Sequence, residues 1–259
     1  MTQEYQKNAQ TRAKRTISGI INEVKNIKKN RIDKEVHEIR SKKTINILNK
    51  NLKPSSKDWL KRHINDRFVS QAKKDGYISR AAYKLTEINQ KFKIFNTQST
   101  NIIDLGASPG SWSEVVLRNF HHKTNLVMVD LLDMKNELEQ KNNVFFIKGD
   151  FTENAIQSKI MEKFNNQKIH LILSDIAPNI SGINAIDSLK MIDILDNIID
   201  FTENNLAKYG NLVFKGFHES VSSELMRKLK KMFTKVKIFK PEASRQSSSE
   251  IYVVCIHRL

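Results

Sequence analysis

Four aspartates stand at or near the ends of apolar segments whose composition is typical of buried β-strands. The segments cover residues 102–105, 125–130, 144–150 and 169–175. In an open parallel sheet the carboxyl ends of the strands lie on one edge, where ligands bind. We therefore expect one crevice to be surrounded by Asp104, Asp130, Asp150 and Asp175. An aspartate at a strand end is also a common helix cap, which would explain any one of them but not all four.

The loop after the first of these segments reads G-A-S-P-G-S from Gly106 to Ser111. A short strand, this turn and the helix-compatible sequence that follows would direct backbone N–H groups at a bound ligand. The glycines are spaced G-x-x-x-G, unlike the G-x-G-x-x-G of dinucleotide pyrophosphate sites, and Asp104 favours a cationic or amine-bearing ligand. S-adenosylmethionine has those properties, although a plain strand-to-helix turn explains the loop alone equally well.

Two of the aspartates suit particular parts of such a ligand. Asp130 follows the glycine loop by roughly twenty residues, the position from which a carboxylate accepts hydrogen bonds from ribose hydroxyls. Asp150 is placed to accept a hydrogen bond from an exocyclic adenine amine. A turn residue is the alternative interpretation of each.

The other segments alternate between helical and extended patterns. An apolar stripe of Ala82, Leu85, Ile88 and Phe92 predicts a helix that opens near Ser79. Further helices are predicted over residues 188–209, ended by Gly210, and over 222–233. Further strands are predicted at 211–215, 236–239 and 250–256, with a polar loop at 240–249. With the four segments above, these make seven strands.

Three charged residues accompany these apolar patterns. Lys215 is the last residue of its predicted strand, and Glu250 opens a strand that is otherwise apolar. Lys84 lies on the predicted helix beside the apolar stripe. By spacing alone, Lys84 cannot be told from an ordinary surface charge.

The composition indicates a nucleic-acid partner. The 259 residues carry a net charge of +16, and no apolar run approaches the length of a membrane helix. A generic basic surface is the alternative. The single cysteine, Cys255, lies in an apolar run, which predicts a core thiol in a reducing compartment. We expect a cytoplasmic monomer with no membrane association and, because the histidines do not cluster, no metal site.

The N-terminal part of the chain differs from the rest. Residues 1–53 contain fourteen Lys or Arg against five Asp or Glu, which is more than half of the net charge. This basic extension is either a solvated tail or an RNA-binding arm, and it has the spacing for one amphipathic helix. Pro54 marks the predicted boundary, so the second predicted domain covers residues 54–259.

The motifs of residues 54–259 resemble the FtsJ/RrmJ family of S-adenosylmethionine-dependent RNA 2′-O-ribose methyltransferases. The stretches that carry the resemblance are S-R-A-A-Y-K-L, D-L-G-A-S-P-G-S-W-S, S-D-I-A-P-N-I-S-G, L-V-F-K-G-F and S-R-Q-S-S-S-E-I-Y. The resemblance implies an α/β, Rossmann-like class I methyltransferase fold. Its sheet would be seven-stranded and mostly parallel, flanked by helices, and its cofactor would be S-adenosyl-L-methionine.

The resemblance also implies a catalytic tetrad of Lys84, Asp175, Lys215 and Glu250. The predicted cofactor site, which combines the loop residues with the contacts that the resemblance implies, consists of Asp104, Gly106, Gly110, Trp112, Asp130, Asp150 and Asp175. Methyl transfer from a sulfonium to a hydroxyl needs alignment of the reactants and removal of the hydroxyl proton. We expect neutral Lys215 to take that proton, Asp175 to orient Lys215, and the other two residues to position the ribose.

The segment between residue 55 and the helix near Ser79 is similar to that of bacterial family members acting on 23S rRNA in the large ribosomal subunit. We therefore expect methylation of a uridine in that RNA, with tRNA as the alternative substrate. A non-catalytic rRNA-binding assembly factor is a different class of hypothesis. A nucleotide-dependent oxidoreductase is disfavoured because the G-x-G-x-x-G motif is missing.

Overall fold

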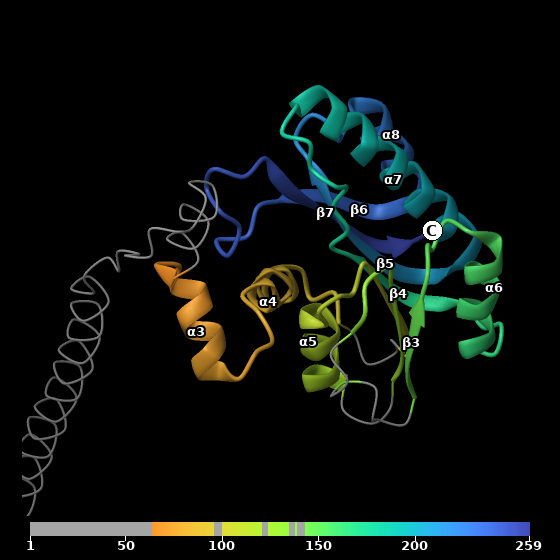
Figure 1. The fold of residues 1–259 in the computed structure, drawn as a ribbon. Coiled ribbons are helices and arrows are strands. Elements are labelled where there is room, and N and C mark those ends of the chain that lie inside the picture. Colours follow the sequence, from red (N-terminus) through yellow and green to blue (C-terminus); the bar gives the residue numbers. More distant parts are fainter. Residues whose placement is uncertain (1–63, 96–99, 121–123, 135–137, 139–142) are drawn as a thin grey trace, which may run out of the picture. The chain divides into compact units, whose positions relative to one another are not determined.

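The computed structural model describes residues 64–95, 100–120, 124–134, 138 and 143–259. Within it, Asp66–Leu259 form one unit, in which helices cover both faces of a central sheet (Figure 1). The predicted basic extension, residues 1–53, and the predicted boundary at Pro54 lie outside the described residues.

Seven strands form the sheet, in the order β3-β2-β1-β4-β5-β7-β6. They are β1 Asn101–Leu105, β2 Asn125–Asp130, β3 Val144–Lys148, β4 Ile169–Ser174, β5 Leu206–Phe217, β6 Phe233–Phe239 and β7 Glu250–Arg258. The strands from β3 to β5 pair in parallel, whereas β7 is antiparallel to both β5 and β6. The predicted seven-stranded, mostly parallel sheet is confirmed.

The register of the strands creates a common edge. Leu105 at the end of β1 pairs with Val129 of β2 on one side and with Ser174 of β4 on the other. Because β7 runs in the opposite direction, its first residue, Glu250, pairs with Phe217 at the end of β5. The start of β7 thus lies at the same edge as the carboxyl ends of the parallel strands, beside the point where the chain order reverses between β1 and β4.

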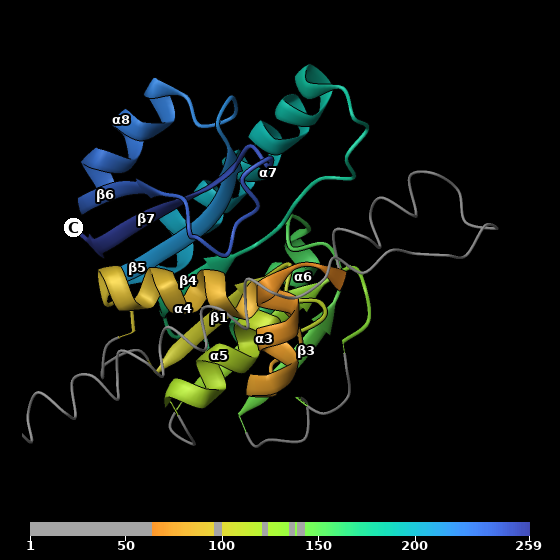
Figure 2. The same cartoon turned by 90° about the vertical axis from the view of Figure 1, so that its left-hand side faces the viewer.

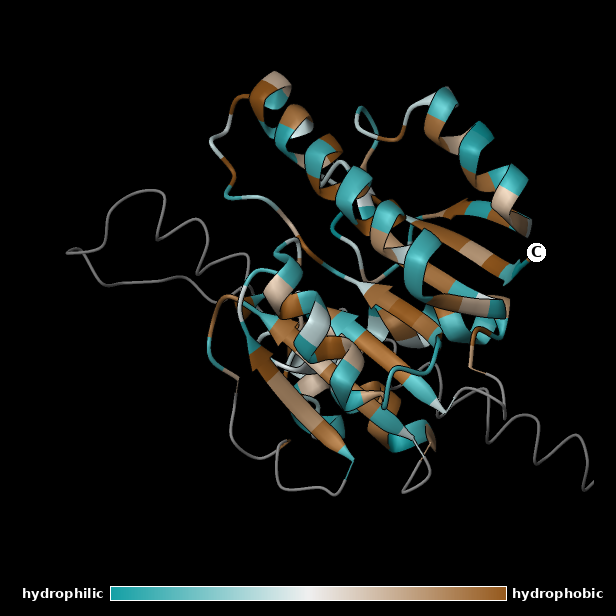
Figure 3. Ribbon diagram, turned by 90° about the vertical axis from the view of Figure 1, so that its right-hand side faces the viewer, coloured by the Kyte–Doolittle hydropathy of each residue, from teal (hydrophilic) through white to brown (hydrophobic). Residues whose placement is uncertain are grey.

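Helices α4 (Ala81–Phe92) and α5 (Ser111–Phe120) cover one face of the sheet, with α3 (Arg67–Asp75) beside them (Figure 2). Helices α6 (Asn154–Lys163), α7 (Asn184–Asn205) and α8 (Ser223–Met232) cover the other face (Figure 3). Apolar side chains from each layer bury themselves against the sheet and form two cores. Each fully buried large apolar side chain contributes about 1.5–3 kcal/mol to folding.

The end of α7 and the start of β5 differ from the prediction. The sequence predicts a helix over residues 188–209, ended by Gly210, but α7 begins and ends four residues earlier. Strand β5 then starts at Leu206 and carries Gly210 inside it. The prediction that Gly210 terminates the helix is therefore wrong.

The helix ends early because residues distant in the chain bind the backbone groups that a longer helix would use. The Arg258 guanidinium, at the end of β7, donates hydrogen bonds to the carbonyl groups of Thr202 (3.0 Å), Glu203 (2.7 Å) and Leu206. Leu206 also pairs with Ile169 of β4, which draws the chain into the sheet. A cation on the last carbonyl groups of a helix is a favourable cap, but one from so far along the chain leaves no local signal.

The loop between β6 and β7 is fastened to helix α4. The Glu87 carboxylate accepts hydrogen bonds from the backbone N–H groups of Glu242 (2.6 Å) and Ala243 (3.0 Å). The Arg80 guanidinium donates to the Ala243 carbonyl. The sequence predicted only that this loop is polar. In the structure it packs against the helix that also carries Lys84, which holds it next to the common edge of the sheet.

Candidate active site

The four residues of the predicted tetrad come from separate elements and meet at the common edge of the sheet. Lys84 Nζ lies 2.9 Å from Glu250 Oε1 and 4.0 Å from Asp175 Oδ2. Lys215 Nζ lies 3.1 Å from Asp175 Oδ1 and donates a 2.5 Å hydrogen bond to the Asp175 carbonyl oxygen. Two ammonium groups and two carboxylates thus form one charge-balanced cluster that three ion pairs hold together.

The local structure explains how the lysines reach this cluster. Helix α4 buries Ala82, Leu85 and Ile88 against the sheet, which leaves Lys84 between the helix and the sheet edge. Lys215 lies near the end of β5, between buried neighbours, and its side chain is 9% exposed. A charged group with so little contact to water requires the paired partners that the tetrad supplies.

Asp175 is the centre of the cluster. Burial by itself would raise the pKa of Asp175, but the ammonium groups of Lys215 and Lys84 and the hydroxyl of Tyr252 together hold that pKa below its ordinary value. The carboxylate is therefore ionised at neutral pH. It can orient an amine and interact with a cationic ligand.

Tyr252 is a member of the site that the sequence reasoning did not single out. Its hydroxyl donates a 2.7 Å hydrogen bond to Asp175 Oδ1, and Lys84 Nζ lies 5.6 Å from the centre of its ring. Tyr252 also pairs with Lys215 across β5 and β7. The available signal was the spacing of two residues from Glu250, which puts both side chains on one face of the strand.

Asp104 is buried beneath the glycine loop. Its Oδ2 accepts a 2.6 Å hydrogen bond from Ser113 Oγ, whereas its Oδ1 has no hydrogen-bond partner. Burial raises the pKa of Asp104 to about 7; Ser113 opposes this shift, and repulsion from Asp175 and Asp130 adds to it. An unpartnered buried carboxylate oxygen fits an amine-bearing or cationic ligand better than a phosphate.

The two glycines of the loop are required by the backbone. Gly106 has a φ of 73°, and a Cβ there would lie 2.4 Å from Ile176 Cγ1. Gly110 has a φ of 109°, and a Cβ there would lie 2.4 Å from Leu138 Cδ1. The loop therefore passes close to its neighbours in a conformation that glycine adopts readily.

The remaining predicted cofactor carboxylates lie at the same edge, where Asp130 is the last residue of β2 and Asp150 follows β3. Asp130 accepts hydrogen bonds from the backbone N–H groups of Ser108 and Leu132, each 2.8 Å long and each to a different oxygen. Asp150 Oδ1 accepts from the backbone and hydroxyl of Thr152. Asp130 is thus fixed to the glycine loop, with one lone pair on each oxygen still open to ribose hydroxyls.

Trp112 is a buried residue that packs against the site and connects two helices. It is 3% exposed, its indole N–H donates a 3.1 Å hydrogen bond to the Ala81 carbonyl, and its ring lies 5.6 Å from that of Tyr252. These contacts join α5 to α4 and support Tyr252. Direct contact of Trp112 with the cofactor stays a prediction.

Two kinds of site are not found in the part of the chain that the structure describes. No group of three His, Cys, Asp or Glu side chains there is arranged to hold a metal ion. Among the described helices, none combines the length and the apolar character needed to cross a bilayer.

Comparison with known families matches residues 77–258 to the model of the FtsJ-like methyltransferases. This range contains the glycine loop and the whole tetrad. The chain belongs to the FtsJ-like methyltransferase family. The family assignment agrees with the resemblance inferred from the motifs and with the sheet order described above.

The relatives of this FtsJ-like methyltransferase include two bacterial proteins, each named ribosomal RNA large subunit methyltransferase E. The one from Psychrobacter sp. is 41% identical over 80% of this chain and 97% of its own length. The one from Pseudomonas fluorescens is 40% identical over 77% of this chain and 93% of its own length. The crystal structure of a protein described as a ribosomal RNA methyltransferase, from Plasmodium falciparum, is 32% identical. It covers 71% of this chain and 99% of its own, with a TM-score of 0.61.

Proposed function

We propose that this FtsJ-like methyltransferase transfers a methyl group from S-adenosyl-L-methionine to the 2′-hydroxyl of a uridine ribose in 23S rRNA of the large ribosomal subunit. The observation that carries the proposal is the convergence of Lys84, Asp175, Lys215 and Glu250 at the edge where the cofactor carboxylates also lie. The names of the two bacterial relatives support the RNA substrate.

In this mechanism Lys215 is the general base. Its Nζ is held by both the carbonyl and the carboxylate of Asp175, and these contacts fix its direction. Once neutral, the amine would take the proton of the ribose hydroxyl and become an ammonium group; the bound cofactor would supply the methyl group, whose bond to sulfur breaks as its bond to the ribose oxygen forms. Lys84 and Glu250 pair with each other, position the ribose and keep the charge of the cluster balanced as the proton moves.

The residues around the glycine loop suit S-adenosyl-L-methionine, which when bound supplies the electrophilic methyl group. Gly106 and Gly110 allow the tight loop conformation that lies against Ile176 and Leu138, and the carboxylate of Asp130, held by the Ser108 N–H, suits the hydroxyls of its ribose. Asp150 suits the adenine amine, and Asp104, whose buried Oδ1 has no hydrogen-bond partner, suits the amine of the methionine part. Alignment of the methyl group with the hydroxyl then provides much of the rate acceleration.

The experiment that tests this function uses the full chain, labelled S-adenosyl-L-methionine, and separate pools of undermethylated large ribosomal subunits and tRNA. Methylated nucleotides are then mapped by their resistance to alkaline cleavage, which a 2′-O-methyl group confers. Label on one uridine of 23S rRNA supports the proposal. Label on tRNA would overturn the substrate, and no label despite measurable cofactor binding would favour a non-catalytic assembly factor.

A further inference from the structure

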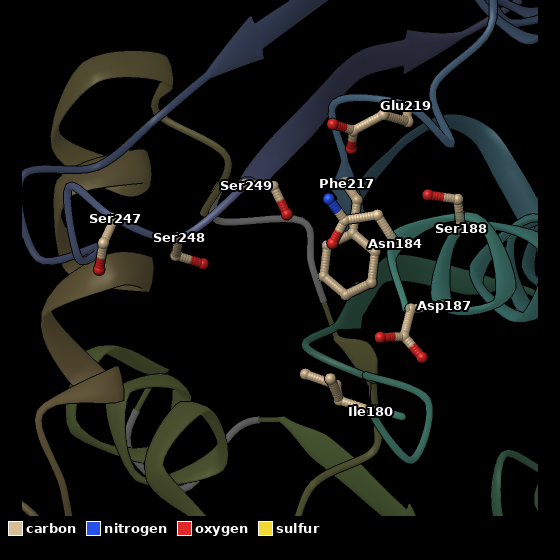
Figure 4. A pocket seen from close by; sticks show the side chains of 9 residues that line it. All are labelled: Ile180, Asn184, Asp187, Ser188, Phe217, Glu219, Ser247, Ser248 and Ser249. Atoms are coloured by element: carbon tan, nitrogen blue, oxygen red, sulfur yellow. The ribbon is translucent and has the colours of Figure 1, made fainter. Parts of the chain in front are cut away.

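Figure 4 shows the side chains that line a small pocket of about 190 Å³; two of them, Phe217 and Ser249, are near neighbours in the chain of Lys215 and Glu250. Its walls come from the loop after β4 at Ile180, the start of α7 at Asn184, the end of β5 at Phe217 and the segment that leads into β7 at Ser249. The loop after β4, β5 and β7 also carry Asp175, Lys215 and Glu250, so the pocket and the tetrad share their supporting structure.

The pocket is tied to the tetrad by direct backbone contacts. Phe217 pairs with Glu250 across β5 and β7, and the backbone N–H of His218 donates a 3.1 Å hydrogen bond to the carbonyl of Ser249. The backbone N–H of Glu250 in turn donates to Ser248 Oγ over 3.2 Å. The backbone that forms this side of the pocket is therefore the same backbone that positions Glu250.

The walls of the pocket are held in place without a ligand. Asp187 accepts hydrogen bonds from both the backbone and the hydroxyl of Ser181 and from the backbone of Gly182, which fixes the loop after β4. On the other side, Lys240 Nζ donates a 2.6 Å hydrogen bond to the Ser248 carbonyl. A preorganised pocket of this kind loses little entropy when it binds.

The lining combines an apolar wall with polar groups that are open to bonding. The Phe217 ring lies among the lining side chains, with Asn184 beside it and Glu219 on the adjoining turn (Figure 4). Within the described part of the chain, no hydrogen bond or ion pair is made by the Asn184 amide or the Glu219 carboxylate. An aromatic face with an amide and a carboxylate suits a flat heterocycle that has both donors and acceptors.

We propose that this pocket holds the pyrimidine base of the nucleotide whose ribose is methylated, an inference that rests on the proposed function. The base and the 2′-hydroxyl are attached to neighbouring carbons of the ribose, so a hydroxyl at the tetrad brings its base to the adjoining pocket. The volume is below the roughly 300–1,000 Å³ of sites for whole drug-sized ligands, which suits a single ring. Glu219 accepts from the ring N–H of uracil, and the Asn184 amide donates to a ring carbonyl.

The test combines changes in the pocket with removal of the base. Large subunits are reconstituted with 23S rRNA that carries either uridine or an abasic ribose at the nucleotide methylated by the wild type. Wild-type, Asn184→Ala and Glu219→Ala chains are compared by kcat/KM for methyl transfer and by cofactor Kd. Matched controls are Asn204→Ala, an exposed asparagine near the other end of α7, and Glu162→Ala near the end of α6.

We expect Asn184→Ala and Glu219→Ala each to lower kcat/KM on the uridine substrate by roughly fivefold to tenfold, the usual effect of one lost hydrogen bond. On the abasic substrate both variants should equal the wild type within about twofold, because the bonding partner is gone. The controls should equal the wild type on both substrates, and cofactor Kd should not change.

Two results would overturn the inference while leaving the proposed function intact. An equal loss on both substrates would mean that the pocket binds another part of the RNA, and no loss on either would mean that it does not bind the RNA. If the wild type itself transfers no methyl group to the subunits, the proposed function fails and the inference fails with it.

Discussion

The hydroxyl of Tyr252 donates a hydrogen bond to Asp175 Oδ1 over 2.7 Å, and the same oxygen lies 3.1 Å from Lys215 Nζ. One carboxylate oxygen thus receives a neutral donor from β7 and a charged donor from β5. The geometry explains why the sheet needs its one reversed strand at this place: only an antiparallel β7 brings both Glu250 and Tyr252 to the edge where β4 ends.

The phenol of Tyr252 is predicted to position Asp175. Tyr252→Phe keeps the ring packing with Trp112 and removes only the donor. Because a hydrogen bond to a charged group is worth about 1.5–3 kcal/mol, we expect kcat to fall by roughly tenfold to a hundredfold with cofactor Kd unchanged. Single-turnover kinetics and calorimetric cofactor binding measure the two quantities. An unchanged kcat would mean that Tyr252 only packs the core.

The base role of Lys215 is tested by Lys215→Met, which keeps the length of the side chain without the amine. General-base removal lowers turnover by about 10²–10⁴-fold, so we expect activity to be almost lost while cofactor binding persists. Lys208→Met, on the exposed part of the same strand, is the matched control and should retain full activity. Substantial methyl transfer by Lys215→Met would assign the proton to another acceptor.

The buried carboxylate of Asp104 is predicted to lower stability as pH rises. Burial raises its pKa from the ordinary 3.8 to about 7, so ionisation occurs in the unfolded chain first, and the free energy of unfolding falls between about pH 4 and pH 7. The difference corresponds to roughly 4 kcal/mol. Asp104→Asn cannot ionise, so its Tm relative to the wild type should rise from pH 5 to pH 8.

The same variant should bind S-adenosyl-L-methionine more weakly, because residue 104 no longer offers a negative charge to the cofactor. Parallel melting curves and cofactor titrations at pH 5 and pH 8 measure both effects. A Tm difference that is independent of pH would show that Asp104 does not carry the expected shifted pKa.

The close passage of the glycine loop predicts a large penalty for Gly106→Ala. Its Cβ would meet Ile176 Cγ1 at 2.4 Å, next to Asp175 of the proposed tetrad, and its φ is positive. Gly182→Ala is the matched control, because its φ of 86° is also positive but no atom lies within 4 Å. We expect Gly182→Ala to cost about 1 kcal/mol and Gly106→Ala to cost about 1–3 kcal/mol more. If Gly106→Ala and Gly182→Ala have equal free energies of unfolding in urea, the loop accommodates the added Cβ at residue 106 without strain.

Much of the fold was readable from local patterns. The runs that end at Asp104, Asp130, Asp150 and Asp175 are short, apolar and followed by turns, and the structure places each in or just after a parallel strand. The start of α8 was also readable, since Ser222 caps it through its own side chain. These signals are local because each depends on residues within a few positions of one another.

Other features had no local signal. The end of α7 depends on Arg258, more than fifty residues further along, and the packing of the β6–β7 loop depends on Glu87 of α4 and on Arg80, which directly precedes α4. The part played by Tyr252 required knowing that β7 is reversed and lies beside β5. Each of these contacts joins segments that are far apart in the sequence, and the sequence does not show that they are close in space.

The sequence by itself determined the strand-and-helix alternation, the glycine loop and, through its motifs, the identity of Lys84, Asp175, Lys215 and Glu250. Only the tertiary structure decided that three ion pairs join these four groups, that Asp104 keeps one oxygen without a partner, and that a pocket is lined by the residue before Glu250. The physical reason is that charge, burial and cavity shape depend on distances between elements. Residue type and spacing specify each element but not the distances between them.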